Sequence, residues 1–333
     1  MSVVGVWREA VDRLTPVPME ARRGFLTLPP TREAHIEAHA SVAAFHQVEL
    51  HQPGSATVPD TIRIAAWNLE RCLYPEEAAR ILQRHGVTLA LLTEMDVGVL
   101  RTGQAHTIGR VAERLGQGYC YGLEFLELVP MEPPAGFARH GSDNSEGYHG
   151  NGIVSAYPIG LPAVIRLDEE ADWYAAPAGR QRRIGNRMAV AATFGIGGTR
   201  FVACSVHLEN RTDGNGRAAQ MRTLLDVLDA YAEGLPVVIG GDLNTHVGPG
   251  GYADASEPLF ATAAARGYDW AACNLARPTT RVSTWSQSEG VRQLDWFCTR
   301  GLRVSDPEVV AALGEDGSVL SDHEMLLLTL KLG

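Results

Sequence analysis

The sequence has almost no lysine. Among its 333 residues only Lys331 is a lysine, so arginine supplies nearly all of the positive side-chain charge. A phosphate-binding P-loop needs a lysine after its glycines, and kinases and Schiff-base enzymes need a lysine in the active site. The sequence therefore excludes these classes of enzyme.

Cysteine is also scarce, and the cysteines are not paired in the sequence. Their odd number, wide spacing and lack of any Cys-x-x-Cys pair argue against a disulfide framework and against a thiolate zinc site. Buried free thiols in a reducing compartment fit this pattern better. The cysteines are Cys72, Cys120, Cys204, Cys273 and Cys298.

Long hydrophobic segments are missing as well. Arg8, Glu9 and Asp12 occur where a signal peptide would need its apolar stretch. No run approaches the roughly 20 apolar residues that a membrane-spanning helix requires. We therefore predict a cytoplasmic protein without membrane insertion.

The composition is that of a globular protein with an excess of acid. Hydrophobic residues make up 45% and charged residues 20%, and 39 acidic against 29 basic side chains give a net charge of -10. Proteins that bind long nucleic acids without sequence preference usually present a basic surface to the phosphate backbone. A nucleic-acid partner is therefore possible but not favoured.

The chain divides into two parts at the turn-rich segment that ends near Pro59. Apolar residues at helical spacing over residues 4–14, and a second helical pattern from Thr31 to Gln47, predict an N-terminal helical extension over residues 1–58. On one face of the second helix lie His35, His39 and His46, for which we expect exposure to solvent rather than zinc binding. Residues 59–333 are predicted to form one α/β domain.

Within this domain, two pairs of segments resemble each other. Residues 61–70 resemble residues 200–209, and residues 87–94 resemble residues 235–242. In each segment an apolar run ends on a polar side chain, and strands of α/β folds deliver functional groups from their ends. We expect the four polar residues to face one cleft: Asn68, Glu94, His207 and Asp242.

The residue types at these positions favour chemistry on phosphate esters. Together with Asn244 and Asp322, Asn68, Glu94 and Asp242 offer oxygen donors, which Mg²⁺ and Mn²⁺ prefer. The nearby histidines, His207 and His323, are suited to proton transfer or charge stabilisation. A single carboxylate after a strand is more often a helix cap or a turn residue, so only the combination supports a site.

The order of the motifs resembles the endonuclease/exonuclease/phosphatase superfamily from about Thr61 to the C-terminus. The Gly-Asp-Leu-Asn and Ser-Asp-His elements are the most distinctive. The matching segments are Trp67-Asn68-Leu69-Glu70, Thr93-Glu94, Gly150-Asn151-Gly152-Ile153-Val154-Ser155, His207-Leu208, Gly241-Asp242-Leu243-Asn244, Leu294-Asp295 and Ser321-Asp322-His323.

This resemblance implies a fold and a set of roles. The fold would be a four-layer sandwich of two packed mixed β-sheets flanked by helices, with the site at one edge. A Mg²⁺ or Mn²⁺ ion would bind Glu94, with Asn68, Asp322 and, in some relatives, a residue at the position of Glu70. The remaining roles would be catalytic for Asp242, Asn244, His207, Asp295 and His323, and substrate-binding for Asn151, Arg187 and Asn210.

Three functions remain open from the sequence. The first is a metal-dependent phosphodiesterase or phosphatase that acts on a small or single-stranded substrate by in-line water attack. The second is an endonuclease or exonuclease acting on DNA or RNA. The third is a non-catalytic phosphate-binding module of the same fold. The identity of the substrate, the number of metal ions and the oligomeric state are left open.

Overall fold

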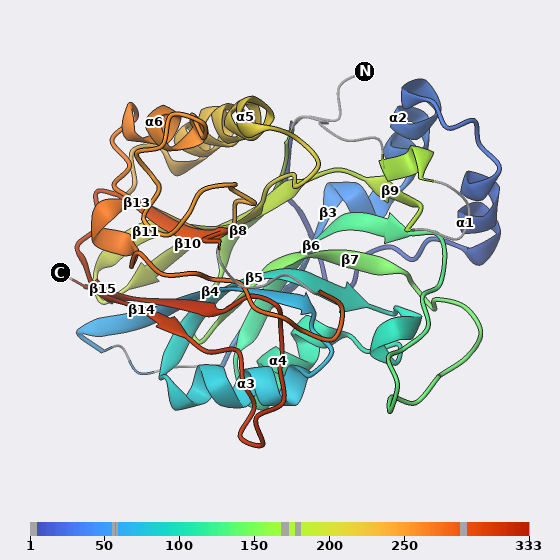
Figure 1. Ribbon diagram of the computed structural model, residues 1–333, viewed down its shortest axis with the longest axis horizontal. Helices are drawn as coiled ribbons and strands as arrows, with labels where there is room; N and C mark the ends of the chain where they lie inside the picture. The colour runs from blue at the N-terminus through green and yellow to red at the C-terminus, as the bar shows by residue number, and fades with distance from the viewer. Residues whose placement is uncertain are drawn as a thin grey trace.

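Two mixed β-sheets pack face to face, and helices cover their outer faces (Figure 1). The computed structural model describes residues 5–54, 57, 59–167, 173–176, 181–286 and 292–332. This arrangement confirms the predicted four-layer α/β sandwich. It also places residues far apart in the chain at one edge of the sheets.

The larger sheet contains the strands that begin the predicted domain. Parallel pairing joins β4 to β5, with Asn68 opposite Thr93, whereas most other neighbours in this sheet are antiparallel. Its strands in spatial order are β14 (Val304–Val310), β15 (Met325–Lys331), β4 (Thr61–Arg71), β5 (Val87–Val97), β7 (Tyr148–Ser155), β6 (Gly118–Glu127), β3 (Gln47–His51) and β2 (Glu9–Val11), and β9 (Arg183–Gly185) pairs with β6.

The smaller sheet also contains a parallel strand pair that carries predicted site residues. Here β11 and β12 run parallel, and His207 is the cross-strand partner of Asp242. β10 and β11 form an antiparallel hairpin and pair along their full length. The strands in order are β1 (Gly5–Trp7), β8 (Gly160–Arg166), β10 (Met188–Ile196), β11 (Thr199–His207), β12 (Val237–Asp242) and β13 (Asp295–Arg300).

The helices begin and end at residues whose chemistry favours these positions. Helix α3 (Pro75–Arg84) starts with proline followed by two glutamates, which suits the positive end of the helix dipole. Helix α4 (Thr107–Leu115) ends at Gly116, whose φ of 65° is left-handed. Helix α5 (Gly214–Ala232) is capped by the carboxylate of Asp213. Shorter elements are α1 (Met19–Leu26), α2 (Arg32–Ser41), α6 (Leu259–Ala264), η1 (Ala43–His46), η2 (Leu100–Thr102), η3 (Trp173–Ala175) and η4 (Ala271–Cys273).

The core has three hydrophobic layers, because alternate side chains of each strand point to opposite faces. In β4, Ile64 and Ala66 face the layer between the two sheets, whereas Ala65 and Trp67 face the layer under α3 and α4. A third layer packs α5 and α6 against the smaller sheet. Figure 1 shows these two helix pairs on opposite sides of the molecule. The sheets are thereby held rigidly, which fixes the positions of their strand ends.

The N-terminal segment differs from its prediction. Val4 lies outside the described residues, and the expected helix over residues 4–14 is wrong, because β1 and β2 form there instead. β1 pairs with β8 and forms the edge of the smaller sheet, and β2 pairs with β3 and forms an edge of the larger sheet. Pairing with available strands thus outweighs the weak helical preference of this segment. The expected helix over residues 31–47 forms as α2 and η1.

The histidine face of α2 also differs from expectation. His35 and His39 are each only 1% exposed. The His35 ring stacks on Tyr174 at a centroid distance of 4.5 Å, and the His39 ring stacks on Phe45 at 4.2 Å. Burial lowers the pKa of His39 well below its usual value. This face is therefore a packing surface and not a solvated one.

No helix among the described residues is both long and apolar enough to cross a lipid bilayer.

Candidate active site

Four of the predicted residues are brought together by the two parallel strand pairs. Asn68 and Glu94 come from β4 and β5, and His207 and Asp242 end β11 and β12. The amide of Asn68 joins the two sheets, because its Nδ2 donates to Glu94 Oε1 at 3.2 Å and to Asp242 Oδ2 at 3.0 Å. Glu94, His207 and Asp242 therefore line one cavity as predicted, whereas Asn68 is fully buried behind it and contacts Glu94 and Asp242.

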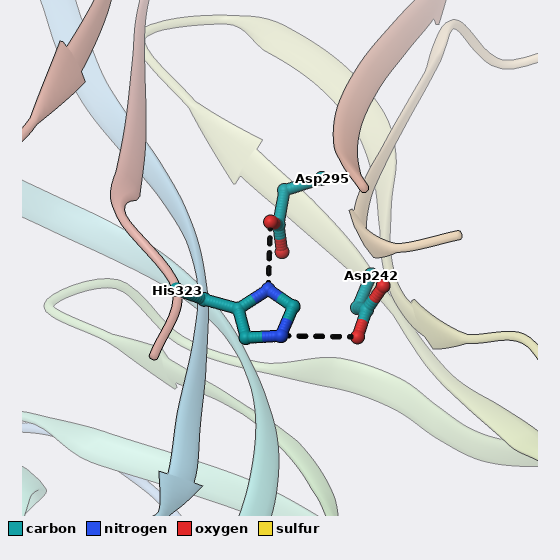
Figure 2. Close-up of side chains that lie close together, drawn as sticks. All are labelled: Asp242, Asp295 and His323. Carbon is teal, nitrogen blue, oxygen red and sulfur yellow. Dashed lines mark hydrogen bonds and ion pairs between the residues drawn. The ribbon is translucent and has the colours of Figure 1, made fainter. Parts of the chain in front are cut away.

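An imidazole lies between two carboxylates beside this bridge (Figure 2). His323 Nδ1 is 2.8 Å from Asp295 Oδ2, and His323 Nε2 is 3.7 Å from Asp242 Oδ2. Burial alone would lower the pKa of His323, but the charges of Asp295, Asp242 and Asp322 raise it well above its usual value. The side chain is therefore a cation at neutral pH, held in one orientation by Asp295.

The carboxylate of Asp242 is held in place by two hydrogen bonds. Asn68 Nδ2 donates to its Oδ2, and the backbone N–H of Asn244 donates to its Oδ1 at 2.8 Å. The backbone of Asn244 adopts a φ of 50°. The side-chain Nδ2 of Asn244 donates to the carbonyl of Leu208 at 3.0 Å. Asn244 thus orients Asp242 through its backbone and is itself fixed by the end of β11.

Three further carboxylates gather beside this group. The backbone N–H of Asp322 donates to Glu70 Oε2 at 3.1 Å, and Ser283 Oγ donates to Glu70 Oε1 at 2.5 Å. Burial and the charge of Asp322 raise the pKa of Glu70 to about 7. Burial also raises the pKa of Asp322. The positive groups nearby do not balance the negative charge that Glu70 and Asp322 carry when both are ionised.

Glu94, the third of these carboxylates, is ionised. Burial alone would raise its pKa, but Arg71, His149 and His207 together lower it well below the usual value. Arg71 Nη1 lies 3.8 Å from one oxygen of Glu94, and His207 Nε2 lies 4.0 Å from the other. A buried, ionised carboxylate next to two others is a donor set that suits a hard divalent cation.

A second grouping of possible metal ligands fits less well. The ligand atoms of Asp242, Asp295 and His323 lie within 4.8 Å of one another. However, the raised pKa of His323 disfavours the neutral imidazole that a metal ligand requires. Glu70, Glu94 and Asp322 all line the same cavity and offer only oxygen donors.

A buried network of charged side chains holds His207 on the side of the ring away from the cavity. Its Nδ1 is 3.3 Å from Glu124 Oε2, and Arg187 Nη1 donates to Glu124 Oε1 at 2.9 Å. Burial would raise the pKa of Glu124, but His207 and Arg187 lower it to about 2. Arg187 Nε also donates to Glu209 Oε2 at 3.2 Å. His207 Nε2 lies 2.9 Å from Arg187 Nη1 and 3.6 Å from Asp242 Oδ2.

Two of the residues predicted to bind substrate lie behind the cavity rather than in its wall. Asn151 is fully buried, and its Oδ1 accepts from the backbone N–H of Glu94 at 3.3 Å. Arg187 is 3% exposed and belongs to the network behind His207. The third residue, Asn210, is exposed and lines the cavity, where its Oδ1 accepts from Arg187 Nη2 at 3.4 Å. The geometry favours positioning roles for Asn151 and Arg187.

Most of the polar groups that face solvent here line one polar cavity of about 460 Å³. This volume lies within the range of roughly 300–1,000 Å³ that is usual for small-molecule sites. The described residues that line it are Glu70, Arg71, Glu94, His207, Asn210, Asp242, Asn244, Thr280, Trp285, Ser286, Leu294, Asp322 and His323.

Sequence reasoning missed four residues at or next to this cavity. Arg71 and Trp285 belong to its wall, and Glu124 supports His207. His149 Nδ1 is 2.8 Å from Asp96 Oδ1, and its Nε2 is 4.0 Å from Glu94 Oε2. The available signal was proximity in sequence, because Arg71 directly follows Glu70, and His149 precedes the Gly-Asn motif.

The fold and the cavity together define an α/β sandwich protein with an acidic, imidazole-containing site at the edge of its two sheets. The chain belongs to the endonuclease/exonuclease/phosphatase family, whose sequence model matches residues 65–323. Members of this family are generally hydrolases of phosphate esters. A search of curated proteins found no match to this chain.

Solved structures show the same fold at low sequence identity. An endonuclease/exonuclease/phosphatase from Beutenbergia cavernae is 19% identical with a TM-score of 0.59, covering 83% of this chain and 72% of its own. A protein of this type from Bacteroides vulgatus is 15% identical with a TM-score of 0.56, covering 83% and 100%. The human Nocturnin catalytic domain with a bound sulfate anion is 18% identical with a TM-score of 0.53, covering 83% and 96%.

Proposed function

We propose that this chain is a divalent-metal-dependent hydrolase of phosphate esters, which cleaves a small or single-stranded substrate by in-line attack of water. The observation that carries the proposal is the cavity lined by His323 with its raised pKa, by an oriented Asp242 and by the carboxylates of Glu70, Glu94 and Asp322. Cleavage of a phosphate ester requires a base for water, neutralisation of phosphoryl charge and stabilisation of the leaving group. Each requirement has a candidate group in this cavity.

The proposed metal ligands are Glu94 and Asp322, with Glu70 and the Oδ1 atom of Asn68. The raised pKa values of Glu70 and Asp322 support this choice, because a cation would relieve their mutual repulsion. When bound, Mg²⁺ or Mn²⁺ would supply Lewis-acid stabilisation of negative charge on the phosphoryl oxygens. These residues would hold the ion at the cavity that Asp242 also lines.

Asp242 is the proposed general base. Its carboxylate lies at the cavity and is fixed by Asn68 and by the backbone N–H of Asn244, so one oxygen can accept a proton from water at a defined position. Fixing the base in advance lowers the entropy that must be lost to reach the transition state. Asn244 therefore acts by orienting the base.

His323 is the proposed source of positive charge on the phosphoryl group. Its Nδ1 is held by Asp295, which leaves Nε2–H on the side of Asp242 and the cavity. A pre-oriented cationic donor stabilises the charge that grows on the phosphoryl oxygens in the transition state. Asp295 acts by keeping His323 protonated and oriented.

His207 and Asn210 complete the proposed machinery on the far side of Asp242. The Glu124–Arg187 network fixes the His207 ring, and its Nε2 faces the cavity. From this position His207 can stabilise the departing oxygen. Asn210, exposed at the cavity wall, can donate a hydrogen bond to the substrate phosphate.

The test is hydrolysis of p-nitrophenyl phosphate and bis(p-nitrophenyl) phosphate with Mg²⁺ or Mn²⁺, with and without EDTA. We expect EDTA to abolish turnover, and D242A to reduce it at least about 100-fold. Asp226→Asn is the matched control, because Asp226 is an exposed carboxylate on α5, 67% accessible.

Three outcomes separate the hypotheses. Turnover that resists both EDTA and D242A would contradict the mechanism. Absence of turnover on every phosphate ester tried would favour a phosphate-binding module. Plasmid nicking or RNA degradation that is lost in D242A would identify the chain as a nuclease.

A further inference from the structure

The wall of the cavity contains a pair of side chains that the proposed reaction does not use. Arg71 and Trp285 both line the cavity, and the Arg71 guanidinium carbon lies 5.4 Å from the centroid of the Trp285 ring. Within the described lining of this cavity, Arg71 is the only arginine or lysine. The pair therefore presents one fixed positive charge next to an aromatic face.

The backbone is arranged to bring Arg71 to this place. In a regular strand Glu70 and Arg71 would point to opposite faces of the sheet. Here Glu70, Arg71 and Cys72 have left-handed φ angles of 45°, 75° and 56°, and the pairing with β5 shifts register between Asn68 and Arg71. Consecutive left-handed residues that carry side chains are uncommon. The irregularity lets both Glu70 and Arg71 reach one cavity.

The guanidinium of Arg71 has little to bind within the described part of the chain. Its ion pair with Glu94 measures 3.8 Å, which is too long for a hydrogen bond, and its Nε atom is buried without a partner there. The side chain is only 19% exposed. A cation on Glu94 would further reduce the negative charge that faces Arg71. A partly buried guanidinium in this state favours an added anion.

We infer that Arg71 and Trp285 form a subsite for the second phosphate of an organic bisphosphate, whose carbon skeleton packs on Trp285. This inference rests on the proposed function, because the first phosphate occupies the reaction centre beside Asp242 and His323. A guanidinium binds phosphate through paired N–H donors, and an indole ring offers a flat apolar surface. The cavity of about 460 Å³ has room for a ligand of this size.

Two kinds of molecule share this chemistry, a nucleoside bisphosphate and a sugar bisphosphate. Binding is measured by isothermal titration calorimetry with Mg²⁺, in the Asp242→Asn background to prevent turnover. Adenosine 3′,5′-bisphosphate is compared with adenosine 5′-monophosphate, and fructose 1,6-bisphosphate with fructose 6-phosphate. This design works whether the enzyme cleaves monoesters or diesters.

We expect at least one bisphosphate to bind about tenfold or more tightly than its monophosphate, equivalent to about 1.4 kcal/mol. R71Q should reduce this preference to below about threefold, and R71K should retain part of it, because lysine keeps the charge but loses the planar fork. Arg80→Gln, on the exposed surface of α3, is the matched control and should keep the full preference.

The variant Trp285→Ala distinguishes a nucleoside bisphosphate from a sugar bisphosphate as the ligand. A greater loss of affinity for the adenosine compound than for the fructose compound assigns the ring to a nucleobase, whereas unchanged affinity for both compounds contradicts packing of the skeleton on Trp285. A preference below about twofold before Arg71 is changed, or equal weakening of both members of a pair in R71Q, would overturn the subsite. Failure of the unaltered chain to hydrolyse any phosphate ester would instead overturn the proposed function, and the calorimetric ratio would still report on Arg71.

Discussion

The two parallel strand pairs that build the site have the same plan but different local geometry. In each, a helix connects two parallel strands that carry polar groups: in β4–α3–β5, Asn68 and Glu94 lie three residues before the ends of their strands, whereas in β11–α5–β12, His207 and Asp242 are the last residues of theirs. The β11–β12 pairing is regular up to the last residue, where His207 is opposite Asp242. The β4–β5 pairing shifts register between Asn68 and Arg71.

This difference in local geometry matches the different roles that we propose for the two strand pairs. Regular strands are sufficient to hold one base and one imidazole in line. A metal site needs several oxygen atoms directed to one point, and a register shift with left-handed residues re-aims neighbouring side chains to do so. Glu94 itself has a φ of 57°, and Glu70 one of 45°. The irregular pair thus gathers ligands and the regular pair orients the reacting groups.

The largest effect is expected from the regular pair. Asp242→Asn keeps the size of the side chain but removes the base, and we expect turnover to fall about 100- to 10,000-fold. Added Mg²⁺ should not restore it, because the lost group is not a proposed ligand. The measurement is kcat on the better model substrate over a range of Mg²⁺ concentrations. Recovery of turnover at high Mg²⁺ would contradict the separate roles that we propose for the two strand pairs.

A different response is expected from the irregular pair. Glu94→Gln removes a charged ligand, so the Mg²⁺ concentration for half-maximal activity should rise about 10- to 100-fold, by analogy with the loss of other metal-supporting groups. Excess Mg²⁺ should restore part of the activity, and calorimetry with Mn²⁺ should show the same loss of affinity. Glu77→Gln, an ion-paired surface glutamate on α3, serves as the control. Unchanged metal affinity in Glu94→Gln would contradict its role.

A smaller effect is expected at Asp295, which acts through His323. The pKa of His323 is raised by Asp295, Asp242 and Asp322, so His323 is protonated at neutral pH and loses its proton as pH rises. Asp295→Asn removes one of these charges and lowers this pKa, so activity should fall at a lower pH than in the unaltered chain. We expect kcat to drop about tenfold or more with KM little changed. An alkaline limb at the same pH in both proteins would argue against the pairing.

The smallest effect on turnover is expected far from both pairs, at Glu49 of β3. Burial would raise the pKa of Glu49, but His106 and Tyr119, whose side chains bond to it at 2.7 and 2.6 Å, lower it below 4.5. Since the folded state has the lower pKa, this stabilisation is present at neutral pH and is lost as pH falls through the folded value.

Glu49→Gln should therefore lower the free energy of unfolding by about 1–3 kcal/mol at pH 7, with little change in kcat. Urea unfolding at pH 7 and at successively lower pH below 4.5 measures the difference, which should shrink as the pH falls. A difference that stays constant across this range would show that the charge of Glu49 does not contribute.

The sequence was most informative at strand ends. An apolar run that stops at a polar residue is a local signal, and it placed Glu94, His207 and Asp242 at one cavity, whereas Asn68 lies fully buried behind it. Side chains whose position depends on a distant partner left no such signal. Arg71 reaches the cavity only through a shift in strand register, and Glu124 lies in a strand that is buried throughout. Periodicity alone assigns neither of them to a site.

The same limit explains the errors outside the site. Residues 5–11 have apolar spacing that suits a helix, yet β1 and β2 pair with strands distant in the chain. His35 and His39 resemble a polar helix face in sequence, but Tyr174 and Phe45 cover them. In both cases tertiary contacts decide the outcome, and a single sequence does not report which partner will be available.

The most direct test of the account is the position of a bound metal ion. Crystals grown with Mn²⁺ and inorganic phosphate would reveal the ion by its anomalous scattering. The account predicts one peak within about 2.5 Å of carboxylate oxygens of Glu94 and Asp322, with phosphate between it and His323. A peak held instead by Asp242, Asp295 and His323, or no peak at saturating Mn²⁺, would contradict the claim that the irregular strand pair gathers the metal.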